Sequence, residues 1–152
     1  MSSDERHAHI PQCFGCGPEN PHALGIALEA GVPIGDAGRG SSAVGRVHFG
    51  PEHQGAPGLV HGGLLATLID ETMGAVVYGG KVTRVTAEMT VRYRRPTPVG
   101  TNLVCRAELG EVTGRRFTVL ATITAADAPD DVLVEADAVY VLLTRKDRSD
   151  QS

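Results

Sequence analysis

The residues His61, Gly62 and Gly63 introduce the most regular apolar segment of the sequence. If a helix starts there, the N–H groups of Gly62, Gly63 and Leu64 have no acceptors inside it. A helix N-terminus attracts negative charge, and the same donors suit an oxyanion that develops on a carbonyl group. The simpler alternative is that the two glycines only allow the helix to enter a crowded place.

Asp70 is the second group that could do chemistry. It lies in the middle of the same segment, between Ile69 and Met73 and one turn from Ala66. Charged groups are rarely buried without a partner, so an aspartate among apolar neighbours indicates a functional carboxylate. The alternative is that both Asp70 and Glu71 lie on a solvated or interface stripe of the helix. For Glu71, on the neighbouring stripe, this is the simpler explanation.

The spacing of Gly62 and Asp70 constrains how they could act together. Eight residues along a helix correspond to about 12 Å, so one carbonyl group cannot contact both on the same helix. A second copy of the helix lying antiparallel would bring Gly62 of one subunit to Asp70 of the other. The sequence therefore predicts a two-fold homodimer with two sites at its interface.

A helix that positions these groups is predicted over residues 61–78. Apolar residues recur there at helical spacing around most of the circumference, so the helix should be buried, and Gly79 and Gly80 end it. Short strands are expected before it at 24–28 and 43–49, separated by a long loop over 31–42. Four longer strands follow at 82–94, 101–109, 117–125 and 132–143, with turns at 113–114 and 128–131.

The order of these elements indicates the architecture. Consecutive hairpins make an antiparallel sheet, and this sheet is the available partner for the apolar helix. The sequence therefore predicts an α+β protein of the hotdog type, in which a curved antiparallel sheet wraps around one long central helix. We expect a single domain over residues 13–144, between a flexible N-terminal segment, 1–12, and a flexible C-terminal tail, 145–152.

Composition excludes several classes of protein. The net charge is −4 and aromatic residues make up 4%, with no tryptophan, which argues against a nucleic-acid partner. No apolar run is long enough to span a bilayer, and the first ten residues do not form an export signal. We therefore expect a cytoplasmic protein without a membrane partner. Three cysteines do not make a disulfide framework.

The pair Cys13 and Cys16 could contribute to a metal site, with His7, His9 or His22 as further ligands. A structural zinc site usually needs four ligands at regular spacing, so one pair with scattered histidines favours a structural role and no bound metal. Cys105 falls in a predicted strand and is expected in the core.

The run from His61 to Gly74, HGGLLATLIDETMG, resembles the hotdog-fold acyl-CoA thioesterases of the phenylacetate-degradation (PaaI-like) type. The segment from Val91 to Pro96 followed by Gly100 looks like the strand after the helix in that family. The segment from Cys13 to Gly25 is similar to a subgroup that includes mitochondrial long-chain acyl-CoA thioesterases. The resemblance covers residues 13–143.

The resemblance implies a role for four residues. The Gly62 amide would polarise the thioester carbonyl, and Asp70 would serve as the general base or nucleophile. Thr86 would assist the attacking water, and His61 would help to shape the pocket. Simple alternation places Thr86 on the polar face with Glu88, so a β-bulge or a later start of the strand is needed to turn it towards the helix. The alternative is that Thr86 is an ordinary strand threonine.

Substrate contacts are also implied by the resemblance. Gly63, Gln54 and Gly55 would line the pocket; some relatives carry asparagine at the position of Gly55, so the group that positions the water stays open. Coenzyme A carries phosphates, for which arginine is suited. The arginines that could flank the pocket mouth are Arg92, Arg94, Arg95, Arg115 and Arg116. The alternative is a solubilising sheet face balanced by glutamates.

The sequence thus predicts a homodimer, or two such dimers in a tetramer, that hydrolyses a fatty or aromatic acyl-CoA to the free acid and coenzyme A. It would need no metal and no organic cofactor. The alternative is a non-catalytic module that binds acyl-CoA or lipid on the same fold. A hotdog dehydratase or hydratase fits less well, because Ala75 occupies the position five residues after Asp70 where such motifs carry histidine.

Overall fold

A computed structural model describes residues 11–30, 33–34, 39–40, 42–76 and 84–143, with the single residues 146 and 149. One helix, α1 (Gly62–Val76), follows the short 3-10 helix η3 (Pro51–His53). The strands are β1 (Ala27–Ala30), β2 (Pro33–Ile34), β3 (Arg39–Gly40), β4 (Ser42–His48), β5 (Arg84–Tyr93), β6 (Asn102–Thr113), β7 (Arg116–Ala125) and β8 (Ala128–Leu142).

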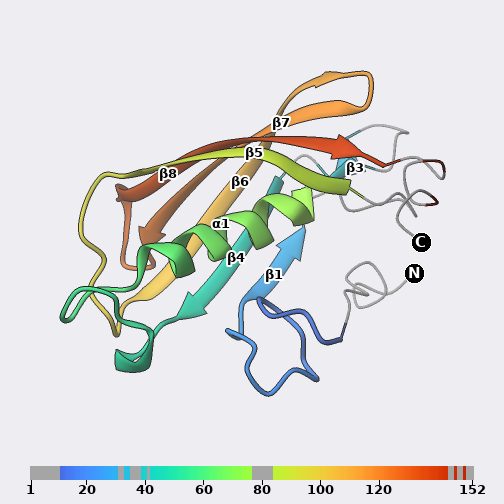
Figure 1. The fold of residues 1–152 in the computed structure, drawn as a ribbon. Helices are drawn as coiled ribbons and strands as arrows, with labels where there is room; N and C mark the ends of the chain where they lie inside the picture. The colour runs from blue at the N-terminus through green and yellow to red at the C-terminus, as the bar shows by residue number, and fades with distance from the viewer. Residues whose placement is uncertain are drawn as a thin grey trace.

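Six of these strands form one antiparallel sheet in the order β1-β4-β6-β7-β8-β5, and β2 pairs with β3 separately. The sheet curves around α1, which lies against β4, β6 and β7 (Figure 1). The fold is therefore the hotdog arrangement that the sequence predicts. β1 and β5 are the two edges of the sheet, so each has one side without a neighbouring strand among the described residues.

The core lies between α1 and the concave face of the sheet. The helix contributes Leu65, Leu68, Ile69, Thr72, Met73, Ala75 and Val76, all buried. Its other side is only half-buried within one chain, at Ala66, Thr67 and Asp70. The prediction of a helix buried on nearly all sides is therefore wrong for the single chain, because the sheet covers one side only.

Strand β5 contains a β-bulge. Thr86 pairs with Tyr140 of β8, and Glu88 pairs with Val139, so Ala87 is an extra residue between two normal pairs. A bulge interrupts the alternation of side chains between the two faces of a strand. Thr86 therefore lies on the face that carries Tyr140, towards α1, although the two-residue period groups it with Glu88.

Several predicted boundaries differ from the structure, among them the end of β6, which lies at Thr113 rather than at residue 109. The first strand starts at Ala27 rather than residue 24, because Gly25 has a φ of 75° and the Leu24 and Ile26 amides bond to the loop before them. Strands β2 and β3 lie within the predicted long loop. β8 starts at Ala128, so the turn predicted at 128–131 is wrong; a bulge in β8 accommodates Pro129, which has no N–H to pair.

Several expectations fall outside the described residues. They are the flexibility of residues 1–10, the candidate metal ligands His7 and His9, the end of the helix at 77–80, the start of the next strand at 82–83 and most of the predicted tail at 145–152. Within the part of the chain that is described, no helix is long and apolar enough to cross a membrane.

Candidate active site

The N-terminus of α1 is capped by the histidine before it. His61 Nδ1 accepts a hydrogen bond from the Gly63 amide at 2.9 Å, and the His61 carbonyl accepts one from the Leu64 amide at 3.0 Å. Of the three amides that the sequence suggests are open, only that of Gly62 has no acceptor among the described residues. One donor is thus available for an oxyanion, and His61 holds the turn that presents it.

The opposite side of Gly62 is held by strand β5. The hydroxyl of Tyr93 donates a hydrogen bond to the Gly62 carbonyl at 2.8 Å. A Cβ atom at Gly62 would lie 3.4 Å from the Tyr93 ring, so the two residues are in contact. Tyr93 is itself 53% exposed, and it was not among the site residues predicted from the sequence.

The loop before the helix brings Gln54 and Gly55 next to His61. The Gln54 side chain accepts a hydrogen bond from the Gly58 amide at 3.0 Å, which closes the loop on itself. A Cβ atom at Gly55 would lie 3.1 Å from the His61 Cα, so a side chain there would push against the histidine. Gly55 therefore allows the close approach of this loop to His61, and Gln54 stabilises the loop.

Asp70 is half-buried and is held by two hydroxyl groups. Its Oδ1 accepts hydrogen bonds from Thr86 Oγ1 at 2.7 Å and from the Tyr140 hydroxyl at 2.9 Å. The same Tyr140 hydroxyl lies 3.2 Å from the Asp70 carbonyl oxygen. These contacts fix one carboxylate oxygen against β5 and β8 and leave Oδ2 without a donor among the described residues.

Tyr140 was not predicted from the sequence as part of the site. Its side chain is buried and stacks on Phe117, with ring centroids 5.4 Å apart. Burial raises the pKa of Tyr140 above its ordinary value, and the negative charge of Asp70 adds to the effect. The phenol therefore stays protonated and donates a hydrogen bond to the Asp70 carboxylate. Its place on the buried face of β8, after Val134, Ala136 and Ala138, was the available signal.

The two halves of the site lie apart in one chain. Tyr93, at one end of β5, contacts Gly62, and Thr86, near the other end, contacts Asp70. Gly62 and Asp70 themselves are separated by about 12 Å along α1. A single chain therefore does not bring the open amide and the carboxylate to one carbonyl group.

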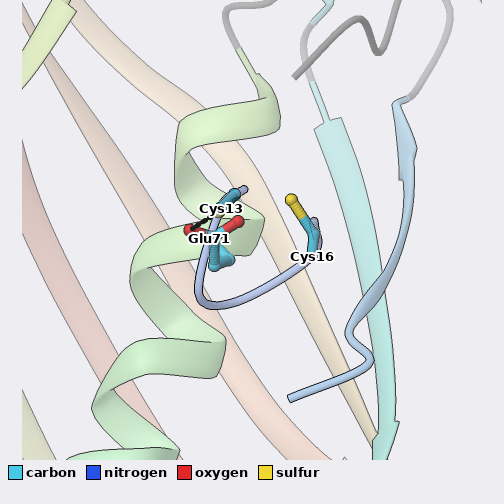
Figure 2. A group of neighbouring side chains, drawn as sticks. All are labelled: Cys13, Cys16 and Glu71. Carbon is cyan, nitrogen blue, oxygen red and sulfur yellow. Dashed lines mark hydrogen bonds between the residues drawn. The ribbon is translucent and has the colours of Figure 1, made fainter. Parts of the chain in front are cut away.

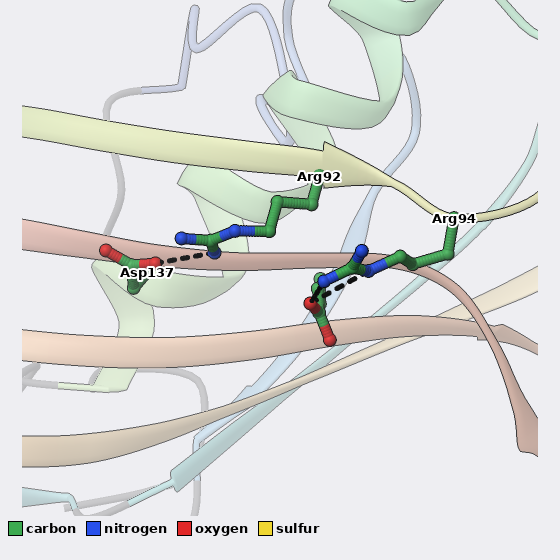
Figure 3. A network of polar contacts seen from close by, with 4 residues as sticks. Arg92, Arg94 and Asp137 are labelled. Carbon is green, nitrogen blue, oxygen red and sulfur yellow. Dashed lines mark hydrogen bonds and ion pairs between the residues drawn. The ribbon is translucent and has the colours of Figure 1, made fainter.

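Three of the five predicted phosphate-binding arginines are in ion pairs. Arg92 donates to Asp137 at 2.8 Å and Arg94 bonds to Glu135 (Figure 3), while Arg95 lies 3.7 Å from Asp131. Asp137 and Glu135 alternate along β8 with buried alanines, so Arg92 and Arg94 lie on the face of the sheet that points away from α1.

The remaining two arginines lie at the Asp70 end of the sheet. Arg115 donates to the Leu142 carbonyl at 3.5 Å, and Arg116 pairs with Val141, the residue after Tyr140.

Within the described chain, the residues that could hold a metal ion are Cys13, Cys16 and Glu71. His22, which the sequence suggests as a further ligand, does not belong to this group.

Comparison with known proteins gives consistent matches. A family model described as "Thioesterase superfamily" matches residues 57–140. The chain is 36% identical over 90 residues to "Acyl-coenzyme A thioesterase THEM4" of Mus musculus, a match covering 59% of this chain and 38% of that protein. The chain thus spans well under two thirds of the curated relatives it matches.

Solved structures support the same fold. The thioesterase superfamily protein RHA08564 superposes with a TM-score of 0.71 at 36% identity, covering 86% of this chain and 60% of that one. A mutant of the phenylacetic acid degradation protein PaaI from Thermus thermophilus superposes with a TM-score of 0.68 at 20% identity, covering 80% and 96%. Both share the sheet wrapped around one helix.

Proposed function

The chain belongs to the thioesterase superfamily, and on that premise we propose that it hydrolyses an acyl-CoA to the free acid and coenzyme A. The observation that carries the proposal is Asp70, a carboxylate in the middle of the helix that Thr86 and Tyr140 hold by one oxygen. A module that only binds acyl-CoA has no need of a carboxylate positioned in this way. The relatives named acyl-coenzyme A thioesterase support the choice of coenzyme A ester.

The Gly62 amide polarises the thioester carbonyl. It is the open donor at the N-terminus of α1, where the aligned peptide dipoles favour negative charge. Negative charge grows on the carbonyl oxygen as the tetrahedral intermediate forms, and the fixed amide stabilises it there. His61 and Tyr93 hold the turn from either side through Gly63 and the Gly62 carbonyl.

Asp70 activates the attacking group. As general base, it takes a proton from water through Oδ2 while the water oxygen bonds to the carbonyl carbon. The carbon–sulfur bond then breaks, and the coenzyme A sulfur leaves and takes up that proton. As nucleophile, Asp70 instead forms a mixed anhydride that water hydrolyses. A single turnover in ¹⁸O-water distinguishes the routes, because only the anhydride route can place the label in the Asp70 carboxylate.

The complete site requires a homodimer in this proposal. Two helices lying antiparallel across a two-fold axis bring Gly62 of one subunit to Asp70 of the partner subunit. The half-buried side of α1, at Ala66, Thr67 and Asp70, is available for such packing. So is the edge strand β5, where Val85 is 42% exposed. Two such dimers in a tetramer remain compatible with these surfaces.

The proposal extends to the substrate and its surroundings. The acyl group is a fatty or aromatic chain, and hydrolysis uses neither a metal nor an organic cofactor. Arg115 and Arg116 are the proposed contacts for the coenzyme A phosphates, since they lie at the Asp70 end and arginine pairs well with phosphate. The site of action is proposed to be the cytoplasm.

The test is free-thiol release from a panel of acyl-CoAs, short to long and aromatic, by the wild type and Asp70→Asn. We expect turnover of one class of substrate and a loss of at least about a hundredfold in kcat, the scale of a removed general base. Asparagine keeps the acceptor for Thr86 and Tyr140, so the variant should fold. Asp130→Asn, at an exposed position in β8, is the matched control and should keep full activity.

Two outcomes would contradict this function. If the wild type binds acyl-CoA but releases no thiol from any ester, the chain is a binding module. If Asp70→Asn is as active as Asp130→Asn, the reaction does not depend on this carboxylate.

A further inference from the structure

A group of side chains outside the proposed active site has the composition of a metal site. The sulfur atoms of Cys13 and Cys16 and a carboxylate oxygen of Glu71 all lie within 4.8 Å of one another. Cys13 Sγ is 3.3 Å from Glu71 Oε1. Figure 2 shows both cysteines on the N-terminal loop, facing Glu71 on α1. All three residues are half-buried.

The loop is shaped so that the two thiols can reach the helix. The Gly17 amide donates to the Cys13 carbonyl at 2.8 Å and closes a tight turn around the pair. A Cβ atom at Gly17 would lie 2.4 Å from the Cys13 nitrogen, and one at Gly15 would lie 2.4 Å from the Glu71 Cγ. Any side chain at these positions would therefore open the turn or push the loop away from Glu71.

The types of donor indicate which metal fits. Two thiolates and one carboxylate are a ligand set that zinc accepts, whereas magnesium and calcium require oxygen ligands. Ligands at the usual zinc distances around a tetrahedral centre lie about 3.5–3.8 Å apart. Cys13 Sγ and Glu71 Oε1 lie 3.3 Å apart, and no two of the three ligand atoms are more than 4.8 Å apart, so side-chain rotations can bring all three to these distances. Three protein ligands leave the fourth position for a water molecule.

We propose that Cys13, Cys16 and Glu71 bind one zinc ion that fastens the N-terminal loop to helix α1. The sequence predicted that no metal is bound, because only two candidate ligands, Cys13 and Cys16, have a recognisable spacing. The third comes from a position 58 residues away and is brought there by the fold. Glu71 follows Asp70 directly, so the ion would also fix the turn of α1 that carries the carboxylate of the proposed active site.

Without a metal ion, the surroundings of Cys16 disfavour the thiolate that zinc binds. Burial raises the pKa of the Cys16 thiol well above its ordinary value, and the neighbouring Glu71 raises it further. A bound divalent cation reverses this balance, because it stabilises the thiolate and the carboxylate together. Without metal, the Cys13 thiol donates a hydrogen bond to Glu71 Oε1.

The experiment measures metal in the full-length chain, purified without a histidine tag from zinc-supplemented cells. We expect one zinc per chain by elemental analysis, and Co²⁺ substituted for it should show thiolate-to-cobalt charge-transfer absorption. The double variant Cys13→Ser/Cys16→Ser should lose both signals, and Glu71→Gln should weaken zinc binding by about tenfold or more. Chelation should lower the Tm of the wild type but not that of the double variant.

Two variants are matched controls. Cys105→Ala removes a cysteine in β6 that is buried in the core, where burial raises its pKa to about 12. His22→Ala removes the exposed histidine that the sequence suggested as a ligand. Both should keep one zinc per chain and the cobalt spectrum.

The proposal is overturned if the reduced chain binds neither Zn²⁺ nor Co²⁺ at micromolar concentration. It is also overturned if the double serine variant keeps its zinc, or if mass spectrometry finds Cys13 and Cys16 joined in a disulfide and reduction does not restore metal binding. None of these measurements uses acyl-CoA, so the metal site and the proposed hydrolysis are judged separately.

Discussion

At the scale of the residue, the notable feature is how Asp70 is held. Thr86 and Tyr140, on strands β5 and β8, donate to the same carboxylate oxygen, and Tyr140 also reaches the Asp70 carbonyl. Two strands of the sheet thus determine the orientation of one side chain on the helix. A carboxylate that must take a proton from a water in a fixed place depends on such positioning.

Removing either hydroxyl should slow the reaction without abolishing substrate binding. We expect Tyr140→Phe and Thr86→Val each to lower kcat by about tenfold, with KM within about twofold of the wild type; tenfold corresponds to about 1.4 kcal/mol of activation free energy. Steady-state kinetics measures both constants. Thr90→Val, on the exposed face of β5, is the control and should be unaffected.

A double-mutant cycle with Asp70→Asn strengthens this test. If the hydroxyls act through the carboxylate, Tyr140→Phe should have much less effect in the Asp70→Asn background than in the wild type. Equal effects in both backgrounds would show that Tyr140 only stabilises the fold.

The role of a single residue could be predicted where the residues that contact it lie nearby in the sequence. Asp70 is recognisable because its apolar neighbours belong to the same helix. Tyr140 was missed because Asp70, which it contacts, lies 70 residues away in the sequence. Glu71 was placed on a solvated stripe because its partner Cys13 belongs to the N-terminal loop. No local pattern contains that information.

At the scale of the element, the bulge in β5 decides which side chain meets the helix. The sequence predicted the strand itself and the residues at its end, because alternation and the prolines after it are local signals. Alternation placed Thr86 on the face with Glu88, however. The extra residue Ala87 reverses that assignment, and an exposed alanine in an edge strand gives no sign of it.

Exchanging the two residues at the bulge tests its role. The variant Thr86→Ala/Ala87→Thr keeps the composition and the strand length but moves the hydroxyl to the extra position. We expect its kcat to fall as far as that of Thr86→Ala, about tenfold, with an unchanged Tm. Wild-type activity in the exchanged variant would mean that β5 adopts another register.

At the scale of the whole molecule, one chain carries every proposed catalytic group but keeps them apart. Tyr93, at one end of β5, contacts Gly62, whose amide is open. Thr86, near the other end, contacts the Asp70 carboxylate, so the two groups lie at opposite ends of the strand. In the proposed dimer, two-fold symmetry would bring Gly62 of each subunit to Asp70 of the other and so form two sites. The architecture of the sheet was predictable from the sequence, whereas the packing of two copies leaves no local pattern beyond the spacing of Gly62 and Asp70.

Mixing two inactive variants tests the shared site. Gly62→Pro removes the amide donor while suiting the first position of a helix, and should lower kcat by about a hundredfold or more. Gly62→Ala keeps the donor and makes an ordinary contact with Tyr93, so it should stay active. Gly62→Pro and Asp70→Asn, unfolded and refolded together, should recover about a quarter of wild-type activity, since half the dimers have one intact site.

Light scattering of the same samples should give twice the mass of one chain, or four times that mass if two dimers pair in a tetramer. A monomer that turns over acyl-CoA, or a mixture with no more activity than its two components, would contradict sites shared between subunits.

The order of the elements also determines which apolar surface is exposed while the chain is being synthesised. Helix α1 is complete in sequence before any residue of β6, β7 or β8, yet β6 and β7 cover much of its apolar face. A nascent chain therefore emerges with Leu68, Ile69 and Met73 exposed until the C-terminal hairpins close. Such contacts between distant segments slow folding and favour aggregation. We therefore expect chaperones that shield apolar helices to bind the chain while it is still on the ribosome. They should dissociate from it only after the last hairpin has formed.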